Sequence, residues 1–164
     1  MHVSFMHCPA VVSRDELLER LAPLRAAGKK IVFTNGCFDI VHPGYVDLLE
    51  RAKALGDVLV LGLNTDASVR RLGKGDDRPF NTYEARAFVL AHLRSVDFVT
   101  AFDEDTPLEL ITAVQPDILV KGGDWNEETI VGRDVVVARG GTVHSLPLLP
   151  GFSTTSLAER IRGT

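Results

Sequence analysis

The feature that most constrains the fold of this chain is a regular alternation of short apolar runs with longer amphipathic segments. Short runs rich in valine, isoleucine and leucine are typical of strands that are covered on both faces, as in a parallel sheet. They predict five strands, at residues 30–34, 57–64, 97–102, 117–120 and 142–148.

Helices are predicted between these strands. Ser13 and Glu16 have the spacing of a capping box at the start of the first helix, and Gly28 follows its end. The segment 135–137 suits a strand or a helix, and we assign a helix because the order of elements leaves room for a crossover there. The predicted helices are residues 13–27, 43–55, 66–72, 82–93, 106–114, 135–137 and 153–162.

Parallel strands joined by helical crossovers have right-handed connections, which place helices on both faces of the sheet. We therefore predict an α/β fold of the three-layer, Rossmann-like type with a five-stranded parallel sheet. No repeat, low-complexity tract or linker interrupts residues 13–164, so we expect a single domain there. Residues 1–12 show no periodicity and are expected to form an extended or disordered leader.

Composition limits the classes of partner and compartment. The chain has 18 Lys and Arg against 22 Asp and Glu, a net charge of −4, which argues against a general binder of nucleic acid or acidic membranes. No apolar run is long enough to span a membrane, and the start lacks the pattern of a signal peptide. Cys8 and Cys37 form no CxxC pair, which fits a reducing compartment. We therefore expect a cytoplasmic protein.

The loop after the first predicted strand carries the strongest signal of a site. It reads TNGCFDIVHPGY over residues 34–45, and it lacks the spacing of both the dinucleotide fingerprint and the phosphate loop. His42 stands where the next helix begins, and a helix N-terminus favours an anion through its free N–H groups and its dipole. Ligands of such sheets bind beyond the carboxyl ends of the strands, which adds the loops 64–66, 121–125 and 150–155.

A mid-chain stretch has a functional and a structural interpretation. Its basic residues form either a phosphate-binding segment or a solvated helix face with its loop. Arg86 reaches phosphates or pairs with Glu84 or Asp77, and Asp39 contacts metal or substrate or only braces its own loop. The basic residues of the stretch are Arg70, Arg71, Lys74, Arg78 and Arg86.

Other polar residues near strand ends have competing roles. Cys37 could be a hydrolase nucleophile with His42 or His144, but a small buried thiol is favoured because no orienting Asn or Asp stands nearby. Asn64 and Asp66 either touch a ligand or, for Asp66, cap the next helix. No histidine outside the first loop has metal-ligand spacing, so no protein metal cage is predicted.

Four segments together resemble a known family. They are TNGCFDIVHPG, LGLNTDASVRRLGKGDDRPF, VKGGDW and GFSTTSLAERI, within about residues 30–162. In order and spacing they are similar to the cytidylyltransferase-like nucleotidyltransferases with an HxGH motif, and most closely to the branch that adenylylates D-glycero-β-D-manno-heptose 1-phosphate. Four motifs in the same order are far more specific than any one of them.

The resemblance implies an activity and its partners. The expected reaction is direct in-line displacement, in which an oxygen of the sugar 1-phosphate attacks the α-phosphorus of ATP and pyrophosphate leaves, for lipopolysaccharide core synthesis. Mg²⁺ would arrive with the triphosphate and be held by phosphates and water. In bifunctional relatives a sugar kinase domain precedes this one, so we expect a stand-alone transferase, a separate kinase upstream and a homo-oligomer.

The resemblance also implies roles for residues at matching positions. The implied catalytic residues are His42, Lys74 and Thr154. The implied nucleotide-binding residues are Thr34, Asn35, Gly36, Cys37, Phe38, His42, Gly44, Tyr45, Arg71, Lys74, Gly123, Asp124, Trp125, Ser153, Thr154 and Thr155. The implied substrate-binding residues are Asp39, Asn64, Asp66, Arg78, Arg86 and Lys121.

One position departs from the family pattern, because the second motif histidine is Tyr45 here. A tyrosine hydroxyl donates a hydrogen bond but stays neutral near pH 7, whereas histidine can carry charge. We expect reduced but real activity, and faster pyrophosphate release in a Tyr45→His variant. Two alternatives stay open: cytidylyl transfer to glycerol 3-phosphate or a related alcohol phosphate, and a nucleotide-binding regulatory protein with weakened catalysis.

Overall fold

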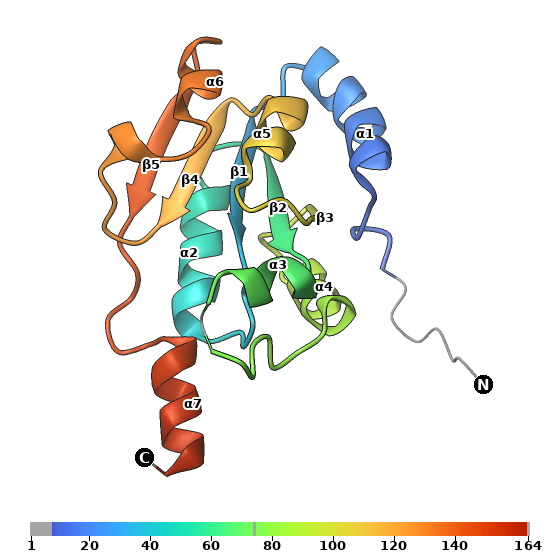
Figure 1. Cartoon of the computed structure of the whole chain (residues 1–164). Helices are drawn as coiled ribbons and strands as arrows, with labels where there is room; N and C mark the ends of the chain where they lie inside the picture. Colours follow the sequence, from blue (N-terminus) through green and yellow to red (C-terminus); the bar gives the residue numbers. More distant parts are fainter. Residues whose placement is uncertain (1–7, 74, 164) are drawn as a thin grey trace, which may run out of the picture.

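A computed structural model gives the structure of residues 8–73 and 75–163. Its centre is a five-stranded sheet in the order β3-β2-β1-β4-β5 (Figure 1). All four neighbouring pairs are parallel, so the predicted parallel sheet is confirmed. The strands are β1 (Ile31–Gly36), β2 (Val58–Asn64), β3 (Phe98–Phe102), β4 (Ile118–Gly122) and β5 (Thr142–Leu146).

Helices connect these strands, and every predicted helix is present. Hydroxyl side chains cap several of them: Ser13, Thr65, Thr82 and Ser153 each accept a hydrogen bond from a first-turn N–H group. None of these helices has both the length and the apolar character needed to cross a bilayer. Their bounds are α1 (Arg14–Ala26), α2 (Pro43–Lys53), α3 (Asp66–Arg71), α4 (Tyr83–Ala91), α5 (Leu108–Val114), α6 (Arg133–Val137) and α7 (Thr154–Arg162), with an unpredicted 3₁₀ helix η1 (Glu127–Thr129).

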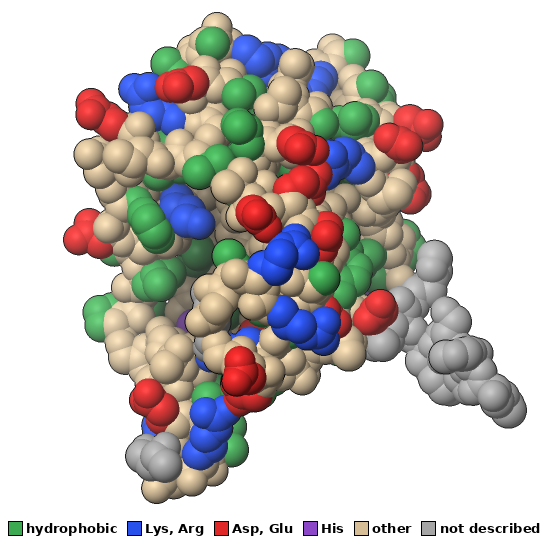
Figure 2. Space-filling model, in the orientation of Figure 1, with side chains coloured by type: hydrophobic (Ala, Val, Ile, Leu, Met, Phe, Trp, Pro, Cys, Tyr) green, Lys and Arg blue, Asp and Glu red, His purple; other side chains and the backbone are tan. Residues whose placement is uncertain are grey.

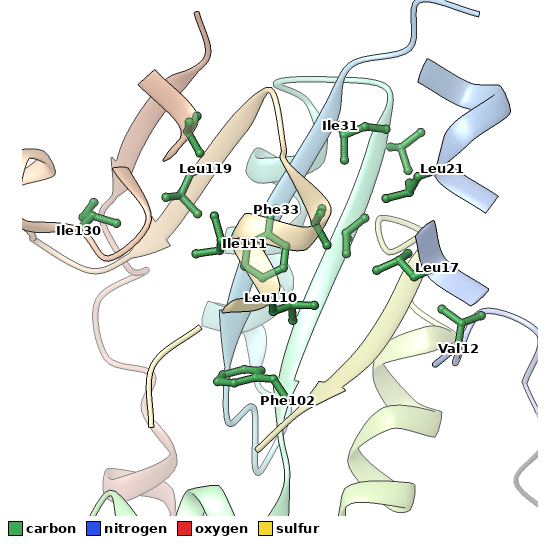
Figure 3. Close-up of a cluster of buried hydrophobic side chains, with 14 residues drawn as sticks. Val12, Leu17, Leu21, Ile31, Phe33, Phe102, Leu110, Ile111, Leu119 and Ile130 are labelled. Carbon is green, nitrogen blue, oxygen red and sulfur yellow. The ribbon is translucent and has the colours of Figure 1, made fainter. Parts of the chain in front are cut away.

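Apolar side chains fill the space on both faces of the sheet. On one face, Leu17 of α1 and Ile111 of α5 lie in the same cluster as Phe33 of β1 (Figure 3). On the other face, Leu49 of α2 and Leu90 of α4 are fully buried against the same strands. Full burial of such a side chain contributes about 1.5–3 kcal/mol, so both helical layers are fixed to the sheet. The predicted three-layer α/β fold is therefore confirmed.

The carboxyl ends of all five strands lie along one edge of the sheet, at the lower side of Figure 1. β1 continues past its predicted end at Thr34, because Asn35 and Gly36 still pair with β2. β5 ends at Leu146, before its predicted end at residue 148. The loops that follow β1, β2, β4 and β5 therefore begin along one edge, which is where the sequence places a site.

The segment before α1 covers an edge of the sheet. Val11 forms an isolated parallel bridge with Val99 of β3, and Val12 donates its N–H to the Val99 carbonyl at 2.9 Å. The side chain of Val12 is buried in the cluster beneath α1. β3 is an edge strand, so this pairing satisfies backbone groups that a bare edge would leave open. Residues 8–12 of the predicted leader are thus docked on the body, and residues 1–7 lie outside the described residues.

Candidate active site at the carboxyl edge of the sheet

A cavity of about 150 Å³ lies where the β1–α2 loop, the segment before α4 and the start of α7 meet. Figure 2 shows this side of the molecule hollowed beside the C-terminal helix, with Lys and Arg side chains near the hollow. The sequence predicts many of the lining residues, but not Val69, Leu148 or Phe152. The lining residues are Cys37, Asp39, His42, Tyr45, Val69, Arg78, Leu148, Phe152, Ser153, Thr154 and Thr155.

His42 is the residue at which the β1–α2 loop becomes a helix. It occupies the N-cap position of α2 and its side chain makes no capping hydrogen bond. The residue is only 8% exposed, yet neither ring nitrogen has a hydrogen-bond partner among the described residues. Buried polar atoms are normally satisfied, so two nitrogens without a protein partner in a cavity wall indicate a ligand-binding position. A cavity at a helix N-terminus suits an anion.

The position of this imidazole is fixed by its neighbours. The ring stacks on Tyr45 with centroids 4.0 Å apart, and the Phe152 ring lies 6.4 Å away on a nearly parallel plane. Gly44 leaves room for it, because a Cβ there would lie 3.1 Å from the His42 ring and 3.2 Å from the Phe152 Cβ. A glycine in the HPG sequence is thus favoured for a steric reason, because any side chain at this position would displace the imidazole of His42.

Burial lowers the pKa of His42 below its ordinary value of 6.5, because desolvation penalises the charged ring. Below about pH 6.5 the imidazole takes up a proton in the unfolded chain but not in the folded one. The free energy of unfolding should therefore decrease as the pH falls, and it should level off below the pKa of the folded state. The His42→Gln variant should lose this component. Urea unfolding at several pH values measures it, and identical pH slopes in both proteins would contradict it.

The N-terminus of α7 faces the same cavity. Ser153 caps the helix by accepting from the Ser156 N–H at 3.0 Å, and its hydroxyl also donates to the Ser156 Oγ. Thr154 is 7% exposed, and its Oγ1 lies 3.3 Å from the Tyr45 hydroxyl. The first N–H groups of a helix lack partners within it, which adds donors at this wall. The α2 and α7 N-termini therefore contribute to one cavity, as the sequence implies for His42, Ser153, Thr154 and Thr155.

Asp39 is a brace for the cavity wall. Its carboxylate is 3% exposed and accepts from the Phe80 N–H, the Asn81 N–H and the Arg78 guanidinium at 2.9, 2.9 and 3.1 Å. These bonds hold Arg78 against the cavity, where Phe80 also lies under its guanidinium at 4.5 Å. The contacts of Asp39 therefore favour the interpretation in which it braces the loop. Asp39 also positions the guanidinium of Arg78.

Arg86 is buried, in contrast to both of its predicted environments. Its side chain is 0% exposed and donates to Asp66 Oδ1 at 2.7 Å, instead of pairing with Glu84 or Asp77. It also donates to the Cys37 and Asn81 carbonyls at 2.8 and 3.0 Å. Arg86 is not among the described lining residues of the cavity, and its implied role in substrate binding stays a prediction. Arg86 ties together three segments around the site.

Asp66 is correspondingly a partner of Arg86, while Thr65 takes the helix cap that Asp66 is predicted to provide. Asn64 is buried at the end of β2, where its amide donates to the Ser68 hydroxyl at 2.8 Å. Its carbonyl oxygen lies 3.8 Å from the Cys37 sulfur. Neither nitrogen of His42 bonds to that thiol, so His42 is not the hydrogen-bond partner of Cys37 in this structure.

One of the predicted basic residues, Arg71, is not among the described lining residues of this cavity. Arg71 lies at the end of α3, where it pairs with Asp105 at 2.9 Å and with Asp103. Its guanidinium therefore bridges α3 to the loop that follows β3. Lys74 lies outside the described residues, and its implied catalytic role stays a prediction.

A second hollow of about 220 Å³ adjoins the first around the end of β4. Lys121 and Trp125 form its wall, with the Lys121 ammonium 5.4 Å from the indole centroid. Gly123 has φ +118° and a Cβ there would lie 2.7 Å from the indole Nε1, so this turn requires glycine. Asp124 is exposed beside it. Cys37, Tyr45 and Leu148 line both hollows, which makes them one groove.

The innermost part of the β1 loop is buried. Thr34 is 1% exposed with an unpaired hydroxyl, whereas Asn35 and Gly36 reach the wall of the second hollow. Phe38 adopts a left-handed backbone with φ 45°, and its ring packs edge-on to Tyr45 at 4.9 Å. A non-glycine residue in that region is strained, and such strain clusters at functional sites. The loop shape therefore agrees with a binding role.

The sequence matches known proteins over most of its length. Residues 33–160 match the profile of a family described as cytidylyltransferase-like. The chain is 52% identical over 162 residues to a bifunctional protein HldE of Rhodopseudomonas palustris (strain HaA2), covering 98% of this chain and 33% of that protein. It is 55% identical over 148 residues to the HldE of Syntrophotalea carbinolica, covering 90% and 30%. The chain thus spans about a third of the length of these curated relatives.

Solved structures agree with this placement. A lipopolysaccharide core biosynthesis protein from Thermoplasma volcanium aligns with a TM-score of 0.62 at 28% identity, over 74% of this chain and 98% of that one. A pantoate–beta-alanine ligase from Francisella tularensis aligns with a TM-score of 0.61 at 13% identity, over 96% and 79%, which supports the fold alone. With the family match, these likenesses show that the chain belongs to the cytidylyltransferase-like family of nucleotidyltransferases.

Proposed function

We propose that the protein transfers AMP from ATP to D-glycero-β-D-manno-heptose 1-phosphate, giving ADP-heptose and pyrophosphate. The observation that carries this proposal is the buried imidazole of His42, whose two nitrogens are unpaired in a cavity that also receives the N-terminus of α7. That wall offers donors for a polyanion. The identity with HldE proteins and the likeness to a lipopolysaccharide core biosynthesis protein support the sugar phosphate as acceptor.

The proposed chemistry is a direct displacement at the α-phosphorus of ATP. A phosphate oxygen of the sugar attacks, a new P–O bond forms, and the bond to the oxygen that bridges to pyrophosphate breaks, so pyrophosphate leaves. Such transfers are accelerated by alignment and by donors placed where negative charge grows. His42, Thr154 and Arg78 line the cavity and would supply those donors. Lys74 is proposed as a further cation from the mid-chain loop.

Mg²⁺ is proposed as the companion of the triphosphate, where it would neutralise phosphate charge. Among residues 8–73 and 75–163, no three acidic, histidine or cysteine side chains gather as a metal site. Asp39, the buried carboxylate of the cavity, is already bonded to Arg78 and two N–H groups. These residues therefore fit an ion held mainly by phosphate oxygens and water.

The proposal extends to partners and compartment. The transfer consumes a sugar 1-phosphate, and we propose that a kinase reaction upstream supplies it. Cys8 and Cys37 form no disulfide in the described structure, and we propose that the protein works in a reducing cytoplasm. A homo-oligomer is proposed from the resemblance alone, and size-exclusion chromatography with light scattering measures it.

A product assay tests the function. The protein is incubated with Mg²⁺ and ATP or CTP, each with the heptose 1-phosphate or glycerol 3-phosphate, and pyrophosphate and the nucleotide sugar are measured. We expect product with ATP and the heptose phosphate. Product only with CTP and glycerol 3-phosphate would favour the cytidylyltransferase alternative, and tight ATP binding without product from any acceptor would favour the regulatory one.

A further inference from the structure

Tyr45 connects two parts of the cavity that come from opposite ends of the described chain. Its ring supports His42 through the stacked contact at 4.0 Å, and its hydroxyl lies 3.3 Å from Thr154 Oγ1 at the start of α7. Phe38 packs edge-on to the same ring. The ring is thus held between neighbours, and its hydroxyl has a defined position beside Thr154.

The direction of this hydrogen bond decides what Thr154 can offer to an anion. Burial raises the pKa of Tyr45, so its hydroxyl keeps its proton and remains a donor at neutral pH. If Tyr45 donates to Thr154, the threonine hydroxyl proton is free to point into the cavity. If Thr154 donates to Tyr45 instead, only the lone pairs of the threonine oxygen face the cavity, and these lone pairs would repel an anion. A donated bond also polarises the threonine hydroxyl, because consecutive hydrogen bonds strengthen one another.

We propose that Tyr45 is a positioning residue, which orients the Thr154 hydroxyl as a donor to the phosphate group that leaves. This inference rests on the proposed function for its catalytic part. At 3.3 Å the contact is at the long end of hydrogen-bond distances, and such contacts commonly tighten when a substrate fills the site. Both Tyr45 and His42 line the cavity. In this proposal Tyr45 acts through Thr154, whereas His42 contacts the anion itself.

The contact with Thr154 changes the outcome expected for Tyr45→His. From the sequence alone, a histidine at this position should raise the rate, because it restores the family motif. An imidazole is shorter than a phenol, however, so from the same backbone position it does not reach Thr154. We therefore expect the Tyr45→His variant to be slower than the wild type, and this reverses the expectation drawn from the sequence.

A double-mutant cycle tests the proposal. Tyr45→Phe keeps the ring and removes the hydroxyl, so we expect kcat to fall about three- to tenfold with KM nearly unchanged, because the bond matters most as charge grows on the leaving group. Thr154→Val should lower kcat at least as much. Adding Tyr45→Phe to Thr154→Val should cost little more, because the acceptor is already gone.

The chain offers a matched control. Tyr83, the only other tyrosine, is the first residue of α4, packs against the core and lies outside the described lining of the cavity. Tyr83→Phe should keep kcat within about twofold. Thermal unfolding of each variant separates a loss of activity from a loss of folded protein, since Tyr45→Phe should unfold near the wild-type temperature.

Pyrophosphate binding, measured by calorimetry, keeps this inference separate from the proposed function. If the wild type transfers no nucleotide to any acceptor, the proposed function fails. The inference about Tyr45 would still predict that Tyr45→Phe weakens pyrophosphate binding when Thr154 is present, and that it has no such effect in the Thr154→Val variant. Unchanged kcat and unchanged pyrophosphate affinity in Tyr45→Phe would overturn the inference. Fully additive losses in the double variant, or a faster Tyr45→His enzyme, would overturn it equally.

Discussion

The His42→Ala variant should lose at least about a hundredfold in kcat for nucleotidyl transfer, because it removes a donor aimed at developing negative charge. The ring is buried in the cavity wall, and neither of its nitrogens has a hydrogen-bond partner among the described residues. Steady-state kinetics that follow pyrophosphate release measure kcat for both proteins. KM should change less than kcat, since the interaction is strongest in the transition state.

His92 is the control for this substitution. It lies at the C-terminal end of α4, where its Nδ1 contacts the Phe88 carbonyl, and it does not line the cavity. His92→Ala should leave kcat close to that of the wild type. A loss below about threefold in His42→Ala, with the protein folded, would refute the role assigned to the imidazole.

The Arg86→Met variant should lower the free energy of unfolding by about 3 kcal/mol, the largest stability effect expected here. The guanidinium is fully buried and serves three acceptors: the Asp66 carboxylate and the carbonyls of Cys37 and Asn81. Methionine keeps much of the volume but leaves these acceptors unpaired in the interior. Urea unfolding monitored by circular dichroism measures the change.

Arg94→Met is the matched substitution at the surface. Arg94 also pairs with a carboxylate, that of Glu50 at 2.7 Å, but its side chain is 88% exposed. Exposed ion pairs contribute about 0–1 kcal/mol, so this variant should unfold almost like the wild type. Equal effects of the two substitutions would mean that the burial of Arg86 has no energetic consequence.

The sheet was predictable because parallel strands covered on both faces require continuous apolar runs. The run at residues 57–64 forms β2, which is buried at every position. The bounds were less predictable where pairing partners decide them: Asn35 and Gly36 are polar or small, yet they extend β1 because β2 lies alongside. The docking of Val11 on β3 was not predictable for the same reason, since it depends on an edge strand far along the chain.

The site was predictable at the level of motifs and not at the level of contacts. The HPG sequence placed His42 at a helix start, which the structure has. Nothing local identifies Asp66 as the partner of Arg86, because 20 positions separate them and nearer carboxylates were available. Tyr45 and Thr154 are 109 positions apart, so their contact follows only from the fold. Phe152 lies within the segment GFSTTSLAERI, but its ring contact with His42 carries no sequence signal.

The wall of the second hollow contains a tryptophan whose fluorescence can report on the site. Trp125 is the single tryptophan of the chain, it is 53% exposed, and its indole N–H is held by the Gly122 carbonyl at 3.1 Å. Indole emission responds to the polarity and charge of its surroundings, so the fluorescence of this protein originates at the rim of the groove. Ligand titrations can therefore be followed without attaching a dye.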